Sequence, residues 1–323
     1  MMTMTTKMLT IRETSAFLLG TDNILILTHQ NPDGDTCGSA AALCVALRSL
    51  GKCCYIFPNS TVTNRYLPFI EKYLAQDSAW QPETVVSVDV ADTTLLTDES
   101  KRYSQDVALC IDHHPSNVLY AKYTLLDAEA AATGEIILDL VRDIGAEVTQ
   151  DIALPLYLAI ATDTGCFRFS NTTSRTFRAA ADLLETGIDF VDINNRFFET
   201  KSKSRLLIEQ RINENIRYFD NGRTAIAALT KQLINDTGAK EEDIENISSF
   251  LRSIEGVEIA VLLRERGDNL WKISVRTSSA ANASAICSLL GGGGHARAAG
   301  CTYSGSYDEA VAAIIRSIET EKT

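Results

Sequence analysis

The sequence predicts an α/β protein in which a mainly parallel sheet is joined by a helical linker to a smaller α/β domain. In the first half of the chain, short apolar runs of β-type alternate with helical patterns, and several of these runs end in an acidic residue. Strand-like runs return near residue 218, after a long polar helical stretch. A chain of 323 residues can form two domains with separate cores.

The first domain is expected to contain five strands and five helices. The strands are predicted at residues 24–28, 53–57, 85–89, 107–111 and 123–126. The helices are predicted at residues 10–19, 39–50, 133–144, 151–161 and 174–185, with Gly51 and Gly187 as stop signals after two of them. Apolar strands separated by helices favour a parallel sheet, and such sheets bind ligands beyond the carboxyl ends of their strands.

The expected domains are residues 1–190, a helical linker at 191–217 and a second domain at 218–323. The linker stretch is polar and periodic, and its basic residues are better explained as a solvated helix face than as a nucleic-acid contact. In the second domain, strands are predicted at 224–229, 257–264 and 270–276, and helices at 283–290 and 307–319.

The bulk composition favours a small anionic substrate. The net charge of −12 opposes binding to duplex DNA or other long nucleic acid. No run approaches the roughly 20 apolar residues that would cross a bilayer, and the first residues lack the apolar core of a signal peptide. The sequence therefore predicts a cytoplasmic protein without a membrane segment.

All four histidines fall within three short motifs. His29 lies in His29-Gln-Asn-Pro-Asp33-Gly-Asp35, His113 and His114 follow Asp112, and His295 ends Gly291-Gly-Gly-Gly-His295. The first two motifs combine imidazole with carboxylate just beyond a β-type run, which is typical of a metal site at a sheet edge. The third is a glycine loop that can bring backbone amides to an anion. Together they favour phosphate chemistry.

Each motif also has a purely structural interpretation. Pro32 and Gly34 are expected to form a turn that aims nearby side chains at one point, but an aspartate-rich N-cap loop would look the same. A single acid at a strand end, such as Asp89, is often only a turn former. Asp163 closes an apolar helix, where an anion is unfavourable unless a cation compensates it. Adjacent His113 and His114 cannot easily face one point, so separate tasks are expected.

Two histidines and four aspartates are the predicted metal ligands: His29, Asp33, Asp35, Asp89, His113 and Asp163. Oxygen donors dominate and thiolate is absent, which favours Mn²⁺ or Mg²⁺ over structural zinc. The number of carboxylates suggests two divalent ions about 3.5–4 Å apart.

These motifs, in this order and spacing, are similar to those of the DHH phosphoesterase family in its DHH–DHHA1 arrangement. The resemblance covers nearly the whole chain and includes residues 29–39, Asp89, residues 112–117, Ala132-Thr-Gly-Glu135, residues 161–169, Ser274-Val-Arg276 and residues 291–300. One departure is that the segment after Asp89 lacks an arginine that many relatives carry, which is expected to alter substrate preference.

The resemblance implies a role for each site residue. His29 and Asp33 would hold one metal, Asp35, His113 and Asp163 the other, and Asp89 would bridge them. Asp112 would orient the site through hydrogen bonds. His114 would contact the scissile phosphate and assist the leaving oxygen.

The resemblance also implies a substrate site in the second domain, which would close over the substrate. Its expected residues are Arg276, Gly292, Gly293, Gly294 and His295, with Arg168 contributed by the first domain. The alternatives are a tight turn for the glycines, an edge or ion-pair role for Arg276 and a structural pair for Arg168.

The compact nanoRNase/pAp-phosphatase type is the form of the family that this chain resembles. It implies hydrolysis of short oligoribonucleotides to mononucleotides and of 3′-phosphoadenosine 5′-phosphate (pAp) to AMP, by attack of a two-metal-activated hydroxide on phosphorus. The alternatives are a phosphodiesterase for linear or cyclic dinucleotides, an exopolyphosphatase and a catalytically silent nucleotide-binding protein. The expected partner is short single-stranded RNA or a small nucleotide, and the architecture is compatible with a homodimer.

Overall fold

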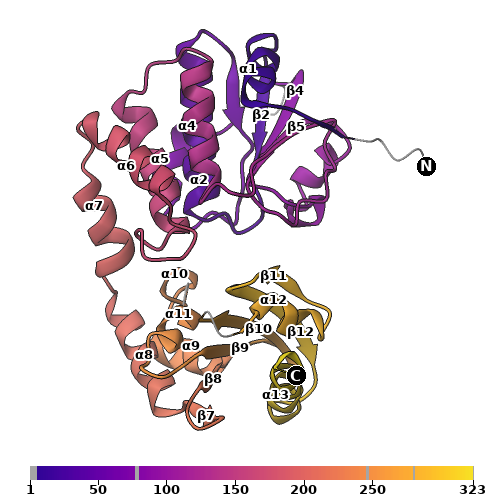
Figure 1. Cartoon of the computed structure of the whole chain (residues 1–323), viewed down its shortest axis with the longest axis vertical. Coiled ribbons are helices and arrows are strands. Elements are labelled where there is room, and N and C mark those ends of the chain that lie inside the picture. The colour runs from indigo at the N-terminus through magenta and orange to yellow at the C-terminus, as the bar shows by residue number, and fades with distance from the viewer. Residues whose placement is uncertain (1–5, 77–79, 245–246, 279–280, 323) are drawn as a thin grey trace. The chain divides into compact units, whose positions relative to one another are not determined.

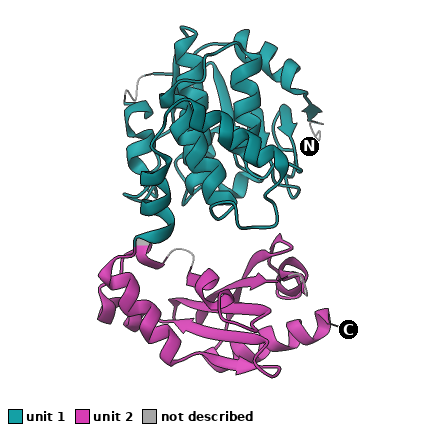
Figure 2. Ribbon diagram, turned by 60° about the vertical axis from the view of Figure 1, so that its left-hand side comes forward, with its two compact units in different colours: residues 1–200 teal, residues 201–323 magenta. Residues whose placement is uncertain are grey.

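A computed structural model describes residues 6–76, 80–244, 247–278 and 281–322. The chain forms two compact units, residues 1–200 and 201–323, each with its own sheet (Figure 1, Figure 2). The helices expected as a linker divide between them. Helix α7 (Phe190–Asn194) and the π-helical turn η4 (Asn195–Glu199) lie in the first unit, and α8 (Lys203–Glu214) lies in the second. The functional division into catalytic domain, linker and substrate domain stays a prediction.

The first unit is built on a six-stranded sheet in which every neighbouring pair is parallel. The order is β1-β6-β5-β4-β2-β3. The strands are β1 (Lys7–Met8), β2 (Ile24–Leu27), β3 (Cys54–Ile56), β4 (Thr84–Val88), β5 (Val107–Asp112) and β6 (Tyr123–Leu126). The predicted parallel sheet is confirmed. Strand β1 is an addition, since its two residues are too short to show a pattern.

One face of this sheet is covered by helices and the other by loops. The helices of the unit before α7 are α1 (Ile11–Leu19), α2 (Gly34–Ser49), α3 (Leu67–Ile70), α4 (Thr133–Asp143), α5 (Gln150–Asp163) and α6 (Ser174–Glu185). Helices α2, α4 and α5 pack against one another on the helical face (Figure 1). The smaller core on the other face is closed by loops and by the 3-10 turns η2 (Thr93–Leu95) and η3 (Ser100–Tyr103), while η1 (Glu71–Tyr73) follows α3.

Glycines let these three helices approach closely. A Cβ on Gly38 would lie 2.2 Å from the carbonyl oxygen of Pro155, and one on Gly134 would lie 2.7 Å from Cβ of Ala159. A Cβ on Gly34 would meet the side chain of Thr162 at 2.4 Å. The contacts therefore bring the C-terminal end of α5 beside the first turns of α2 and α4.

Helix α2 begins five residues earlier than its sequence pattern indicates. Asp33 is the N-cap, and its Oδ1 accepts a hydrogen bond from the Thr36 amide at 3.1 Å. The expectation that Gly34 belongs to a turn and that Asp35 precedes the helix is therefore wrong. A good N-cap acceptor is sufficient to start a helix even when glycine follows it, so Asp35 lies inside the first turn.

The second unit has a mixed sheet with the order β11-β12-β10-β9-β8-β7. Its strands are β7 (Arg217–Phe219), β8 (Thr224–Leu229), β9 (Ile259–Gly267), β10 (Leu270–Thr277), β11 (Gly293–His295) and β12 (Ala298–Ser304). Only the β8–β9 pair is parallel within the described residues. Strands β7, β11 and β12 are not predicted by the sequence pattern, because the segments of β11 and β12 are rich in glycine and alanine.

Helices cover the two faces of this sheet unequally. Helices α12 (Ala283–Ser288) and α13 (Tyr307–Glu321) pack on one face. On the other face α8, α9 (Lys231–Thr237), α10 (Glu241–Ile244) and α11 (Ile247–Arg252) form a core with β8 and β9. No helix in the described residues of either unit is long and apolar enough to cross a membrane.

Candidate metal centre

The predicted site residues follow the strands at the point where the strand order reverses. Strand β2 leads to β3 on one side, whereas its other neighbour β4 leads to β5 in the opposite direction. Crevices at such reversal points are the usual ligand sites of parallel sheets. His29 follows β2, Asp89 follows β4, and Asp112 ends β5.

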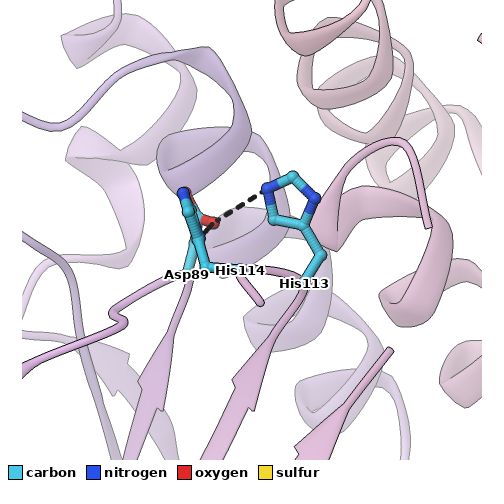
Figure 3. A group of neighbouring side chains, drawn as sticks. All are labelled: Asp89, His113 and His114. Atoms are coloured by element: carbon cyan, nitrogen blue, oxygen red, sulfur yellow. Dashed lines mark ion pairs between the residues drawn. The ribbon is translucent and has the colours of Figure 1, made fainter. Parts of the chain in front are cut away.

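Asp89 lies between two imidazole rings. Its Oδ2 is 3.8 Å from Nε2 of His29, and its Oδ1 is 3.8 Å from Nε2 of His113. Figure 3 shows Asp89 with His113 and His114, whose side chains converge on its carboxylate. Asp89 is buried and has a left-handed backbone conformation (φ 60°), which is uncommon for a non-glycine residue and is often retained at functional sites.

Backbone carbonyls fix the orientation of both rings. Nδ1 of His29 lies 2.8 Å from the carbonyl oxygen of Gln30, and Nδ1 of His113 lies 3.1 Å from that of Ala130. A carbonyl can only accept, so Nδ1 carries a proton and Nε2 faces the carboxylates. Metal-binding histidines are usually oriented in this way.

The six predicted ligands form two adjacent groups, and Asp89 lies beside a histidine of each group. In the group of His29, Asp33 and Asp89, and in the group of Asp35, His113 and Asp163, the donor atoms lie within 4.8 Å of one another. Nε2 of His113 is 3.3 Å from Oδ2 of Asp163 and 3.8 Å from Oδ2 of Asp35. A third group contains Asp89, His113 and His114.

The buried carboxylates are held by groups that the sequence analysis did not single out. Asp35 accepts hydrogen bonds from the amides of Thr133 (2.7 Å) and Gly134 (2.9 Å) at the start of α4, and from the Ser39 hydroxyl (2.9 Å). Asp89 accepts from the hydroxyls of Thr36 (2.6 Å) and Thr133 (3.0 Å). The signals in the sequence were Thr36, directly after the first motif, and the Ala132-Thr-Gly-Glu135 segment.

Electrostatics show that the cluster is suited to a cation. Burial and the charges of Asp89 and Asp163 raise the pKa of Asp35 well above its usual value. Partial burial and the carboxylates of Asp33 and Asp89 do the same to the pKa of Asp163. Burial also opposes ionisation of Asp89, but the nearby histidines, His114 first, lower its pKa. Repelling carboxylates with two imidazole donors fit divalent ions that prefer oxygen ligands.

Asp112 organises the pair of histidines. It is fully buried, and its Oδ1 accepts hydrogen bonds from the amides of His113 (2.8 Å) and His114 (3.2 Å) and from Nδ1 of His114 (2.8 Å). Asn117 donates to its other oxygen at 2.6 Å. The pKa of His114 is raised to about 10, because the hydrogen bond to Asp112 and the charge of Asp89 outweigh the effect of burial. The two rings lie at 69° to each other, yet both face the carboxylate of Asp89, so the expectation that adjacent histidines cannot easily face one point is wrong. Their separate tasks stay a prediction.

Arg168 lies in the loop after α5. Its Nε donates to the Gly165 carbonyl at 2.6 Å, and this is its one side-chain hydrogen bond to the part of the chain that the structure describes. The contact favours the structural alternative for Arg168, and its contact with substrate stays a prediction.

The expected substrate residues of the second unit lie around the end of β10. Arg276, Gly293 and Gly294 line a cavity of about 440 Å³, whose other lining residues are Lys272, Ser274 and Ala298 to Thr302. Gly292 and His295 do not line it, although His295 is exposed on β11. A Cβ on Gly292 would lie 2.2 Å from the Gly300 carbonyl oxygen, so that glycine has a packing reason of its own.

A cluster of carboxylates and histidines beyond parallel strands, accompanied by a second unit with a cationic cavity, defines an enzyme that acts on phosphate esters. The chain belongs to the DHH phosphoesterase family. The profile of the DHH family, N-terminal domain, matches residues 23–160, and that of the DHHA1 domain matches residues 222–320.

Relatives and solved structures agree with this membership. The chain is 34% identical over 303 residues to the bifunctional oligoribonuclease and PAP phosphatase NrnA of Thermus thermophilus, covering 93% of this chain and 90% of that protein. It is 26% identical to the cyclic-di-AMP phosphodiesterase GdpP of Geobacillus thermodenitrificans over 85% of this chain but 44% of GdpP. The crystal structure of an exopolyphosphatase-related protein from Bacteroides fragilis has a TM-score of 0.86 at 25% identity, with 97% and 96% of the two chains covered.

Proposed function

We propose that this phosphoesterase hydrolyses short oligoribonucleotides to mononucleotides and pAp to AMP, using two divalent ions, Mn²⁺ or Mg²⁺. The observation that carries the two-ion proposal is Asp89, whose two oxygens each face the Nε2 of a different histidine. The substrates are those in the name of the Thermus thermophilus relative, which aligns with nearly the whole of this chain.

The ligand sets follow the two groups around Asp89. His29 and Asp33 would hold one ion, and Asp35, His113 and Asp163 would hold the other, with Asp89 shared. When bound, such ions lower the pKa of a water molecule and neutralise phosphoryl oxygens. The amides of Thr133 and Gly134 keep Asp35 in place for this task.

His114 supplies the group that meets the substrate. Asp112 accepts its Nδ1 proton and, with Asp89, keeps the ring protonated. The imidazolium is therefore suited to neutralise an oxygen of the scissile phosphate and to donate a proton to the leaving oxygen. Arg276 and the glycine loop would bind a phosphate that is not cleaved.

The proposal extends to the setting in which the enzyme works. With a net charge of −12, short single-stranded RNA or a small nucleotide is favoured over duplex DNA. We place this activity in the cytoplasm, where such substrates arise. A homodimer is compatible with the architecture.

Turnover assays on the purified protein test the proposal. The Mn²⁺-loaded protein would be given a 5′-phosphorylated RNA dinucleotide, pAp, cyclic di-AMP and polyphosphate in separate reactions. Mononucleotide from the dinucleotide, together with AMP and phosphate from pAp, is the expected result. Turnover of cyclic di-AMP or polyphosphate alone would instead favour the functions in the names of the GdpP relative or the Bacteroides fragilis neighbour. Nucleotide binding with no turnover at all would favour a silent binder.

A further inference from the structure

Part of one face of the second sheet is a cavity lined by residues of β10, β11 and β12, although α11 also approaches β10. Helices α8 to α11 pack over β8 and β9 on that face, and the residues of β10 and β12 beside them line the cavity of about 440 Å³. Lys272, Ser274 and Arg276 alternate along β10 and so point to the same face. Their partners on β12 are Thr302, Gly300 and Ala298, which are small enough to leave the surface open.

Arg276 and Lys272 lie at the two ends of this open surface, and neither is neutralised. The guanidinium of Arg276 donates to the Val275 carbonyl at 3.1 Å and pairs with no carboxylate among the described residues. Lys272 has neither a hydrogen bond nor an ion pair with any part of the chain that the structure describes. Burial and neighbouring arginines lower the pKa of both groups, which means that each cation lies near like charge.

Further cations lie beside Lys272, with one carboxylate among them. Arg264 faces Lys272 across the β9–β10 pair, and Arg266 follows on the same strand. Glu241 is bound at 2.6 Å to each terminal nitrogen of Arg264 and lies 4.0 Å from Arg266. The single carboxylate of Glu241 therefore lies among three cations, Arg264, Arg266 and Lys272. This local excess of positive charge contrasts with the net charge of −12 for the whole chain.

We propose that this cavity on the second sheet is an extended phosphate-binding surface, on which Arg276 holds one non-scissile phosphate of the substrate and Lys272 holds a second. The inference rests on the proposed function and adds a preference for substrate length. Four residues along a strand span about 13 Å, so with both side chains extended each cation can hold a phosphate of its own. A bisphosphorylated mononucleotide such as pAp has one phosphate besides the scissile one, whereas a 5′-phosphorylated trinucleotide has two.

The kinetic test compares Lys272→Gln with the wild type on pAp and on 5′-phosphorylated triadenylate. The loss of one charge-assisted hydrogen bond should raise KM for triadenylate about tenfold. The kcat for triadenylate and the KM for pAp should be unchanged. The matched control is Lys203→Gln, which removes an exposed lysine of α8 that does not line the cavity. An equal rise in KM for both substrates, or no rise for either, would overturn the proposal.

A binding measurement keeps the inference separate from the proposed function. Calorimetry with triadenylate in EDTA, repeated at several salt concentrations, gives the dependence of log K on log salt without turnover. Each phosphate contact with a single strand adds about 0.7 to the slope, so Lys272→Gln should lower the slope by about that amount. An unchanged slope contradicts the phosphate surface. If the wild type binds with the expected slope but hydrolyses neither substrate, the proposed function fails and the surface stands.

Discussion

Oδ1 of Asp112 accepts a hydrogen bond from Nδ1 of His114 at 2.8 Å, and this contact sets the protonation state of the histidine. In Asp112→Asn the charge is lost, so the pKa of His114 should fall. We expect kcat to fall by at least about 100-fold, the usual contribution of a positioned acid. Activity that needs protonated His114 is lost as pH rises through its pKa, so the alkaline limb of the pH profile of kcat should move to lower pH. Steady-state assays across pH measure both effects.

Asn117→Ala is the matched control for Asp112. It removes the hydrogen bond to the other oxygen of Asp112 and leaves the charge. A smaller loss of kcat and a nearly unchanged alkaline limb are expected. If Asp112→Asn kept the wild-type pH profile, the role of Asp112 in holding the His114 proton would be wrong.

Asp89 and Asp33 should differ in how many ions their loss removes. Asp89 contacts His29 and His113, which belong to different ligand sets, whereas His29 is the one histidine of the described residues that Asp33 contacts, at 3.9 Å. We expect Asp89→Asn to reduce bound Mn²⁺ by both ions and Asp33→Asn by one. Metal analysis after gel filtration measures the stoichiometry, with circular dichroism as the check on folding. Equal losses in the two variants would contradict a shared ligand.

Metal binding should release protons and should strengthen as pH rises. The pKa values of Asp35 and Asp163 are raised in the folded chain, so each carboxyl holds its proton more tightly when folded than when unfolded. The protonated carboxyls of Asp35 and Asp163 therefore stabilise the folded chain most at a pH below the usual pKa of an aspartate. This stabilisation is lost as the pH rises through their raised pKa values. The metal-free protein should therefore have a lower Tm at pH 7.5 than at pH 5.5, and added Mn²⁺ should raise Tm more at the higher pH.

Calorimetry in two buffers with different protonation enthalpies measures the released protons directly. Asp89 does not contribute to the released protons between pH 5.5 and 7.5, because its pKa is lowered and it is already ionised there. An observed binding enthalpy that is the same in both buffers would show that no protons are released.

Arg175 should stabilise the turn that holds Asp35. Its guanidinium pairs with Asp127, Asp139 and the buried Glu135, whose oxygens accept no hydrogen bond among the described residues. Arg175→Gln leaves the Glu135 charge without a partner. We expect a loss of about 2 kcal/mol in the free energy of unfolding, less than for a fully buried pair because the Arg175 side chain is 36% exposed. Urea unfolding measures the loss.

Asp139→Asn and Glu135→Gln separate the two sides of this network. Asp139 is 41% exposed, so its loss should cost no more than about 0.5 kcal/mol. Glu135→Gln removes the buried charge itself and should partly restore the stability of Arg175→Gln. Additive effects in the double variant would mean that the two residues are not coupled.

The glycine loop offers a comparison between neighbours. Gly294 has φ 142°, and a Cβ there would lie 2.7 Å from both the Ala298 carbonyl oxygen and Cα of Ala299. A Cβ on Gly293 would meet nothing within 4 Å. Gly294→Ala should therefore lower the free energy of unfolding by about 1–3 kcal/mol, and Gly293→Ala should not. Thermal unfolding decides this, and equal stability of the two variants would show that β11 can shift away from β12.

The clustering of the proposed ligands could be predicted because charged groups follow strands whose pattern is clear. Apolar runs before His29, Asp89 and Asp112 indicate strands, and a parallel sheet places their carboxyl ends together. The hydrogen-bond donors that hold the buried carboxylates were harder to predict from the sequence. Thr133 donates through its amide as well as its hydroxyl. The Ala132-Thr-Gly-Glu135 segment indicates that this helix start matters, but it does not show which carboxylates the two groups bind.

The second unit was harder to predict from its strands. Strand β11 and the first half of β12 consist of glycine and alanine apart from His295, so they carry little β propensity, and they pair because glycine permits close approach. The start of α2 was missed for a related reason, since Gly34 suggests a turn until Asp33 is recognised as the N-cap. Lys272 was overlooked because the sequence does not show which strands lie beside β10. Only the strand order reveals that Lys272 and Arg276 share one face of the sheet and line the same cavity.

The six proposed ligands extend from residue 29 to residue 163, and the last of them ends α5. Synthesis proceeds from the N-terminus, so a growing chain on the ribosome cannot complete the centre until α5 has emerged. Before then, β2, β4 and β5 bring their aspartates together without a full ligand set. A divalent ion that needs the full ligand set can therefore bind only after α5 has packed against α2 and α4.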